Sequence, residues 1–284
     1  MPSLKEIKGR ITSVRSTLKI TSAMKMVASA KLHKAQNAIG GMLPYQTRMN
    51  HILEGLIGEG VSFSGSPFAE GREVRNVAVI AFASNASLCG GFNSNAIRLA
   101  KKTIEEYESQ GVSVTVFAVG RKMAESLKKS GRPSSGDWND ISEHPSFEGS
   151  SLLAKEVMDG FESGRFDKVE IVYNHYASTA SQPTVREVWL PLTIESGMGK
   201  EIEYIVEPSR EELILTLIPN YLRLKLFTIL LDTAAAEHAA RTVAMQTATD
   251  NGNEILEDLT LEYNKSRQQR ITSELLDIAG GKQE

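Results

Sequence analysis

A short glycine-containing stretch, LCGGFN at residues 88–93, is the part of this chain that could most readily bind a reactive ligand. It follows an apolar run of strand length and precedes a helical pattern, so its glycine pair could present backbone N–H groups to a phosphate. However, the chain has no GxxxxGK[ST] and no GxGxxG motif, and no acidic residue stands at a clear ribose-binding position. We therefore favour a structural turn or a protein-contact loop over a nucleotide site.

Other groups that could support catalysis are scattered along the chain. Its five histidines show neither HxxxH nor HExxH spacing, so the sequence predicts no metal site. No serine has a GxSxG context and no poised Cys–His pair is present. Cys89 is the single cysteine, which excludes an internal disulfide and any zinc site built from cysteines. We expect no catalytic, cofactor-binding or metal-binding residues.

The composition indicates a soluble protein of one or two domains, since 41% of the 284 residues are apolar. No apolar run reaches the eighteen or so residues that cross a bilayer, and the first ten residues lack the apolar core of a secretory signal. A reducing, cytoplasmic compartment therefore fits the lone cysteine. If a membrane matters, we expect it to be reached through another protein.

The net charge of −3 is distributed unevenly along the chain. Residues 1–58 carry nine basic and two acidic side chains, whereas residues 207–284 carry eight basic and thirteen acidic ones. A basic first helix and an acidic last helix attract each other, and surplus positive charge is available to an acidic partner. Nucleic acid is the rival partner, but the basic residues lack interleaved aromatic residues and no nucleic-acid-binding module is recognisable.

The end of the chain predicts one near-continuous helix over residues 219–280, broken only by Gly252. At 1.5 Å per residue it would be roughly 90 Å long. A helix of that length must pair with another long helix or enter a partner. Near its end, Leu275, Leu276 and Ile278 form an apolar tip that needs an enclosing partner.

The beginning of the chain supplies the pairing helix, predicted over residues 3–39 with a kinked extension from Pro44. Its apolar positions alternate by three and four residues, as in a coiled coil. The pattern consists of Leu4, Ile7, Ile11, Val14 and Leu18, and continues more loosely through Met24, Val27, Lys31 and Ala35. The two ends therefore predict a helical hairpin with a domain inserted between them.

The middle of the chain alternates strands and helices, which predicts an α/β layer with a largely parallel sheet. Apolar strand-like runs occur at residues 75–84, 112–120, 168–178 and 184–194. We divide the chain into an N-terminal coiled-coil helix at 1–58, an α/β domain at 73–206 and a C-terminal coiled-coil helix at 207–284.

Three blocks of sequence resemble the γ subunits of F-type ATP synthases. They are LKITSAMKMVASAKL in the first helix, LCGGFNSN after the first strand, and EHAARTVAMQTATDNGNEI with LTLEYNKSRQQRITSELLDI at the end. The resemblance covers the whole chain in order. It implies an antiparallel coiled coil of the terminal helices with a Rossmann-like α/β domain between them.

The resemblance also implies a function as the central rotor shaft of the complex. The coiled coil would sit inside a hexamer of three α and three β subunits, and the α/β domain would form a foot with the ε subunit on the c-ring. Proton flow through the ring would turn the shaft and drive the β subunits through ATP synthesis or hydrolysis. The chain would be non-catalytic and peripheral, at the cytoplasmic face of a bacterial inner membrane, with the membrane reached only through the c-ring.

Individual contact residues follow from the same resemblance. Those expected to face the β subunit are Met24, Lys25, Cys89, Arg267, Gln268 and Thr272, and those on the side of the c-ring and ε are Tyr204 and Glu207. One departure concerns the three residues before LCGGFN, where the family usually has Asp-Arg-Gly and this chain has Asn85, Ala86 and Ser87. The charged contacts of that triplet are therefore not expected here.

Two other classes of function remain open at the level of sequence. A coiled-coil adaptor with a ligand-binding α/β head predicts a stable free dimer and a small molecule at LCGGFN. A Rossmann-type enzyme requires a cofactor motif, and the chain shows none. Stoichiometric ATP binding by the isolated chain would argue against the rotor subunit.

Overall fold

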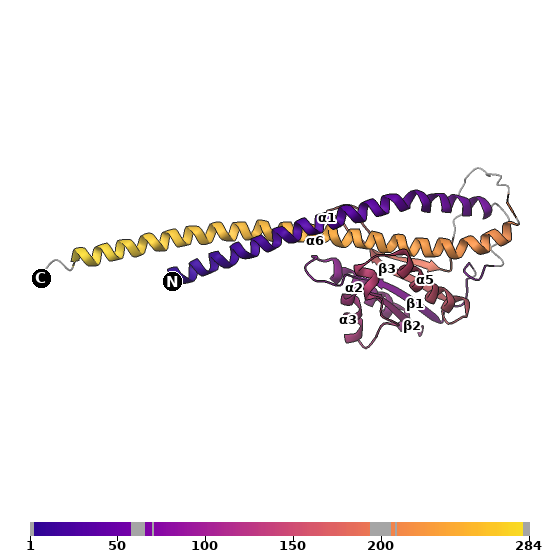
Figure 1. Ribbon diagram of the computed structural model, residues 1–284. Helices are drawn as coiled ribbons and strands as arrows, with labels where there is room; N and C mark the ends of the chain where they lie inside the picture. Colours follow the sequence, from indigo (N-terminus) through magenta and orange to yellow (C-terminus); the bar gives the residue numbers. More distant parts are fainter. Residues whose placement is uncertain (1–2, 58–65, 70, 194–205, 208, 281–284) are drawn as a thin grey trace. The chain divides into compact units, whose positions relative to one another are not determined.

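The computed structural model describes residues 3–57, 66–69, 71–193, 206–207 and 209–280 (Figure 1). The chain divides into two compact units. Unit 1 consists of Met1–Ser29 and Arg241–Glu284, and unit 2 consists of Ala30–Ala240. The first helix, α1 (Leu4–Ile57), and the last, α6 (Arg210–Gly280), each contribute residues to both units.

Unit 2 is built around a four-stranded mixed sheet in the order β2-β1-β3-β4. Its strands are β1 (Asn76–Phe82), β2 (Ser113–Val119), β3 (Lys168–Asn174) and β4 (Thr184–Leu190). The central strand β1 pairs in parallel with β2 and β3, whereas β4 pairs antiparallel with β3. Two parallel pairings out of three agree with the expected, largely parallel sheet.

Both faces of this sheet are covered, which explains why β1 is an almost unbroken apolar run. Val77, Val79 and Ala81 face α2 (Phe92–Ser109) and α3 (Arg121–Lys129). The alternate residues Ala78 and Ile80 face α5 (Phe147–Glu162) and the parts of α1 and α6 that belong to unit 2. Because strand side chains alternate between faces, one strand serves two cores.

The α/β layer and the two long terminal helices are confirmed, but several boundaries differ from expectation. Helix α5 starts at Phe147, where Ser146 accepts a hydrogen bond from the Gly149 N–H and caps it. A short helix, α4 (Asn139–Glu143), lies between α3 and α5.

Helix α1 does not end near residue 39 but continues through Gly40, Gly41 and Pro44 to Ile57. The expected helix end was wrong because tertiary packing overrides these unfavourable residues. Beyond Pro44, the side chains of Leu53 and Leu56 are buried in the core of unit 2 and hold the last turns in place.

The apolar stripe of α1 is more regular than the sequence analysis indicated. Its alternation by three and four residues continues to the end of the helix. The buried or half-buried positions of the stripe are Leu4, Ile7, Ile11, Val14, Leu18, Thr21, Lys25, Ala28, Leu32, Ala35, Ile39, Met42, Gln46, Met49, Leu53 and Leu56. The looser continuation through Val27 and Lys31 was wrong, since both are exposed. Polar residues at Thr21 and Lys25 hid the true pattern.

Helix α6 begins at Arg210, nine residues before the predicted start at Pro219. Burial of Ile214 and Ile218 stabilises this extra part. An eighteen-residue window within Glu212–Ala279 has a mean hydropathy of 1.5, and 44% of it is buried. By length and composition alone the window is apolar enough to cross a membrane. A core helix passes the same test, and from Tyr221 to Ala240 α6 packs in the core of unit 2.

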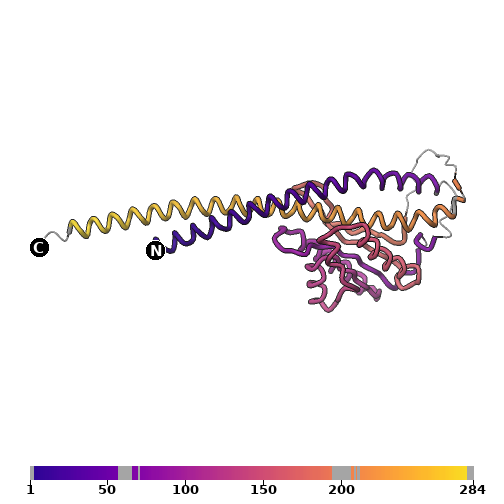
Figure 2. Tube along the Cα trace, viewed as in Figure 1, coloured from indigo at the N-terminus to yellow at the C-terminus, as the bar shows by residue number. Residues whose placement is uncertain are grey.

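In unit 1, the first part of α1 lies beside the last part of α6 (Figure 2). Hydrogen bonds join Thr21 to Thr249 and Lys25 to Gln246, and Leu18 lies against Gly252. Partner numbers fall along α6 as they rise along α1, so the two helices are antiparallel. This is the expected helical hairpin.

Candidate partner-binding surfaces

The first candidate surface is the loop between β1 and α2, at residues 84–91, which includes the glycine pair of LCGGFN. Leu88 and Gly90 both adopt positive φ angles, of 66° and 59°. Positive φ is uncommon for a leucine, so this loop holds Leu88 in an unfavourable conformation. The Leu88 side chain is 62% exposed, whereas neighbouring Cys89 is 1% exposed. The loop therefore buries its thiol and presents a large apolar side chain.

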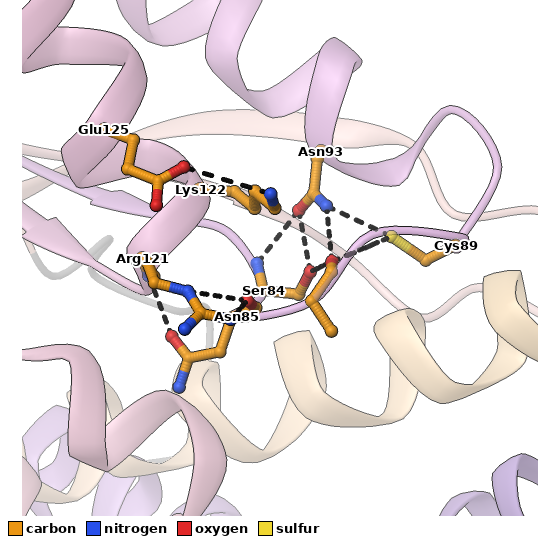
Figure 3. Close-up of polar contacts among 8 residues, drawn as sticks. Ser84, Asn85, Cys89, Asn93, Arg121, Lys122 and Glu125 are labelled. Carbon is orange, nitrogen blue, oxygen red and sulfur yellow. Dashed lines mark hydrogen bonds and ion pairs between the residues drawn. The ribbon is translucent and has the colours of Figure 1, made fainter.

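Asn93, in the first turn of α2, holds this loop together (Figure 3). Its Oδ1 accepts a hydrogen bond from the Ser84 N–H at 2.9 Å and lies 3.0 Å from the Ser84 hydroxyl. Its Nδ2 donates to the Ala86 carbonyl at 3.0 Å and to the Cys89 Sγ at 3.2 Å. One amide thus satisfies polar groups at both ends of the loop and fixes its shape.

Asn85 connects the same loop to the start of α3 (Figure 3). Its Oδ1 accepts from the Arg121 N–H at 2.8 Å, and its carbonyl accepts from the Arg121 guanidinium at 2.7 Å. Its Nδ2 donates to the Asn139 carbonyl at 2.9 Å. Asn85 is the first residue of the triplet before LCGGFN, and its amide is engaged within unit 2.

This arrangement gives the phosphate interpretation of the loop no support. Residues 84–93 contain no lysine or arginine. The residue before α2, Gly91, provides no side-chain cap, and much of the polar capacity of the loop is used in its own hydrogen bonds. An anion site at a helix N-terminus needs N–H groups that are free to bind the ligand. A protein-contact loop remains the better interpretation.

The buried side of the loop packs on the alanine-rich part of α6. Cys89 and Phe92 contact Ala236 and Ala240. The carbonyl of Phe92 also accepts a hydrogen bond from the Asn174 amide at 3.0 Å. Because alanine has only a methyl side chain, the loop can approach the helix closely. The run of small residues in the sequence therefore marks a close contact inside unit 2.

The second candidate surface lies on the α1 part of unit 1, where Met24 and Lys25 were expected to face a partner. Both side chains are half-buried. The Lys25 ammonium donates to the Gln246 Oε1, so it is engaged between the two helices. Three apolar side chains of this part of α1 are unexpectedly exposed, since Ile20, Met26 and Val27 are 60%, 64% and 57% exposed. For Ile20 and Met26, a position outside the expected stripe is the signal that could have identified them, whereas Val27 was expected within the stripe.

The third candidate surface is the end of α6. Every side chain from residue 267 to residue 279 is exposed, including Arg267, Gln268 and Thr272. These three lie within about one and a half turns of the helix, and the Thr272 hydroxyl donates to the Gln268 carbonyl at 3.0 Å. Leu275, Leu276 and Ile278 are 61%, 66% and 69% exposed. No other described part of the chain therefore covers the expected apolar tip.

The two residues expected to contact the c-ring and the ε subunit are only partly described. Glu207 is exposed. Tyr204 lies outside the residues that the structure describes.

A buried charge network lies elsewhere in unit 2, between β3, β4 and α2. Glu170 is 2% exposed and pairs with Lys168 at 2.9 Å and Arg186 at 2.6 Å, while the Tyr107 hydroxyl donates to it. Burial alone would raise the pKa of Glu170, but hydrogen bonds from Arg186, Tyr107 and Lys168 outweigh it and lower the pKa. Every charge here has a partner, which indicates a structural rather than a catalytic role.

Metal ligation finds no support among the described residues. No group of three or more histidine, cysteine, aspartate or glutamate side chains there is placed to hold an ion.

Comparison with known proteins gives concordant matches. A family model described as ATP synthase matches residues 3–283. The chain is 53% identical over 287 residues to the ATP synthase gamma chain of Phocaeicola vulgatus, and the match covers 99% of both chains. It is 49% identical over 296 residues to the ATP synthase gamma chain of Bacteroides thetaiotaomicron, again with 99% of both chains covered.

Solved structures with a similar fold come from ATP synthases as well. One is a chain of the Euglena gracilis mitochondrial ATP synthase, from a structure of OSCP, F1 and the c-ring, with a TM-score of 0.64. It shares 19% sequence identity, and the match covers 98% of this chain and 93% of that one. A chain from the central stalk and c-ring of the Tetrahymena thermophila enzyme gives a TM-score of 0.58 at 20% identity, covering 81% of this chain and 99% of that one. At such identities the likeness concerns the fold.

Proposed function

The chain belongs to the family of ATP synthase gamma chains, and we propose that it acts as the non-catalytic rotor shaft of an F-type ATP synthase. Whole-length identity to gamma chains establishes the subunit. The features that support a transmission role are the two long helices and the bare end of α6. We infer this role from the two long helices and from the exposed surface at the end of α6.

The observation that carries the proposal is the exposed end of α6. Residues 267–279 are all exposed, and large apolar side chains occupy several sides of this helix. A soluble protein rarely leaves such a surface uncovered unless a partner encloses it. In the proposed assembly, this end of α6 lies inside the hexamer of three α and three β subunits.

The proposed mechanism needs only a stiff element that contacts its neighbours differently on different sides. Proton flow turns the c-ring, and unit 2 rests on the ring together with the ε subunit. The α1 and α6 segments of unit 1 then present changing surfaces to the three β subunits in turn. Each β subunit responds by binding, converting or releasing nucleotide, so the chain couples rotation to catalysis without touching ATP.

The individual contacts are part of this proposal. Arg267, Gln268 and Thr272 lie on the exposed end of α6 and are available to a β subunit. Met24 and Lys25 are half-buried at the edge of the helix pair, next to exposed Met26 and Val27, and would contact a β subunit there. Cys89 would act through its loop, since the thiol itself is buried and the neighbouring Leu88 is the exposed side chain.

The side of unit 2 nearest the membrane would include Glu207, which is exposed, and Tyr204. We assign both to contacts with the c-ring and the ε subunit. The chain itself would be peripheral, reaching the membrane only through the c-ring, and we place it at the cytoplasmic face of the bacterial inner membrane. The charged contacts of the usual Asp-Arg-Gly triplet are replaced here by the internal hydrogen bonds of Asn85.

A native mass measurement tests the proposal directly. The full-length chain, tagged and expressed in its own host, should be recovered within an assembly that hydrolyses ATP, whose mass accommodates three α subunits, three β subunits and the c-ring. The isolated chain should show no stoichiometric ATP binding by equilibrium dialysis. Recovery as a free homodimer, or one bound ATP per isolated chain, would instead support an adaptor with a ligand-binding head.

A further inference from the structure

A cavity of about 460 Å³ lies within unit 2, between α1, α6, the end of β3 and the middle of β4. Its walls include the side chains of Ile39, Leu43 and Ile229 and two tyrosines, Tyr173 and Tyr176. This volume lies within the range of small-molecule sites, roughly 300–1,000 Å³. None of the residues expected to contact the β subunit, the c-ring or ε lines the cavity, although Tyr176 of its wall packs against the cluster of Cys89 and Phe92.

One side of the cavity is held in a fixed arrangement by Asp232. Its Oδ2 lies 2.7 Å from the His175 Nδ1, and its Oδ1 accepts a hydrogen bond from the Tyr176 N–H at 3.1 Å. The Tyr176 hydroxyl in turn accepts from the Gln36 amide at 2.8 Å. These contacts link α6, the end of β3 and α1, so a ligand would meet a wall that is already ordered.

The cavity carries a surplus of negative charge. The carboxylates of Asp232 and Glu187 line it, against one ammonium, that of Lys225, which lies 3.5 Å from Glu187. His175 also lines the cavity, and its Nδ1 faces the Asp232 carboxylate. Burial raises the pKa of Tyr173, and the carboxylates of Glu187 and Asp232 raise it further. The potential inside the cavity therefore favours a cation.

Gly40 keeps this space open from the side of α1. A Cβ atom added there would have no other atom within 4 Å, so neither close packing nor a positive φ requires glycine. A glycine inside a helix costs about 1 kcal/mol relative to alanine. Gly40 lines the cavity, and its neighbour Gly41 is equally open but is not part of the lining. The pair therefore offers a matched comparison.

We propose that this cavity is a binding site for a small organic cation with an apolar body, such as an aryl-alkyl ammonium ion. The ammonium group is placed near Asp232 and Glu187, and the apolar body lies among the aliphatic and tyrosine side chains. Tyrosine rings add a favourable cation–π contribution. Because the site rests on the geometry of unit 2 alone, it does not depend on the proposed rotor function.

Ligand-observed NMR on the full-length chain at pH 8 tests this inference, with 2-phenylethylammonium as the probe. The neutral isostere 2-phenylethanol is the control for charge. We expect saturable binding of the ammonium ion at least about tenfold tighter than that of the alcohol, which corresponds to about 1.4 kcal/mol. No saturable binding at millimolar concentration, or equal binding of the alcohol, overturns the proposal.

Three variants locate the site. Gly40→Leu fills the cavity and should weaken binding of the ammonium ion at least tenfold, whereas Gly41→Leu should leave it unchanged. Leucine is a better helix former than glycine, so both chains should fold. Glu187→Gln keeps the shape and should reduce the preference for the ammonium ion over the alcohol several-fold. Equal binding by the two leucine variants, or an unchanged preference in Glu187→Gln, places the ligand elsewhere and overturns the assignment.

Discussion

The same two helices are packed very differently in the two units of this protein. In unit 2, α6 from Tyr221 to Ala240 is buried or half-buried at every position, because the sheet, the loop after β1 and α1 all contact it. The described residues of unit 1 are segments of α1 and α6 alone, and every side chain from residue 267 to residue 279 is exposed. The comparison teaches that unit 2 supplies its own core, whereas unit 1 leaves much of its surface for other proteins.

The contacts between the helices differ in chemistry as well. In unit 2, Leu32 packs against Ala235 and Ala239. In unit 1, polar hydrogen bonds such as Thr21 to Thr249 lie between the helices. A polar pair in a helical interface fixes the register of the helices at some expense of stability. Unit 1 therefore combines buried apolar residues such as Ile7 with polar pairs that fix the register, whereas the contact around Leu32 in unit 2 is apolar.

The largest effect is expected from truncating a buried leucine of unit 2. Leu53→Ala removes a side chain that is 0% exposed and leaves a cavity, so it should lower the free energy of unfolding by about 2–5 kcal/mol. Leu261→Ala in unit 1, where the side chain is 69% exposed, should change it by less than about 0.5 kcal/mol. Urea denaturation followed by circular dichroism measures both. Equal losses would contradict the contrast.

The next effect concerns the buried charge of Glu170. Its pKa is lowered in the folded chain, so its contribution is present above the unfolded value near 4.5 and is lost as the pH falls through the folded value. Glu170→Gln should cost roughly 1.5–3 kcal/mol at pH 7 and less as the pH falls below 4.5.

Thermal unfolding between pH 3 and pH 7 measures this dependence. Glu125→Gln provides the matched control, because the Glu125 carboxylate is 52% exposed and its ion pair with Lys122 is long, at 3.9 Å. A cost for Glu170→Gln that does not vary with pH would show that the ionised carboxylate is not the stabilising group.

A smaller effect is expected from enlarging a small residue of α6. Ala239→Leu introduces bulk at a position that is 0% exposed and packs against Leu32, and should cost about 1–3 kcal/mol through overpacking. Ala248→Leu, at an exposed position of the same helix in unit 1, should be nearly neutral. Thermal unfolding of the two variants gives the comparison, and a neutral Ala239→Leu would mean that the helices can separate without loss.

The smallest effect on folding, but a large one on function, is expected at the end of α6. Replacing both Arg267 and Gln268 by alanine should change the free energy of unfolding by less than about 0.5 kcal/mol, since both side chains are exposed. Coupled ATP synthesis in membrane vesicles should nevertheless slow. Lys265→Ala, also exposed on α6, is the control for loss of charge alone. A folding defect in the double variant would show that the pair stabilises the chain itself.

Much of the fold could be predicted from the sequence because its signals are periodic. Alternation by three and four residues identified the first part of α1, and β-rich apolar runs identified the four strands. The prediction of helix ends from helix-breaking residues was wrong, since Gly40, Gly41 and Pro44 lie inside a continuous helix. Their local cost is outweighed by side chains such as Leu53, whose burial depends on contacts that are distant in sequence.

The contacts at the surface were harder to predict from the sequence than the fold. Exposure of the apolar tip could be predicted because Leu275, Leu276 and Ile278 cover more of the helix than one partner helix can bury. By contrast, the loop after β1 depends on Asn93 and Asn85, whose hydrogen bonds reach residues as distant in sequence as Arg121 and Asn139. No local pattern encodes such contacts, and the burial of Cys89 beneath exposed Leu88 follows from them.

The stripe of α1 returns to the same side of the helix every seven residues from Leu4 to Leu56. A repeat of this length makes paired helices wind around each other in a left-handed sense. Turning one end of such a pair in one direction tightens the winding, and turning it in the other direction loosens it. The torsional stiffness of the helix pair should therefore depend on the direction of rotation, so that strain is stored differently in the two directions.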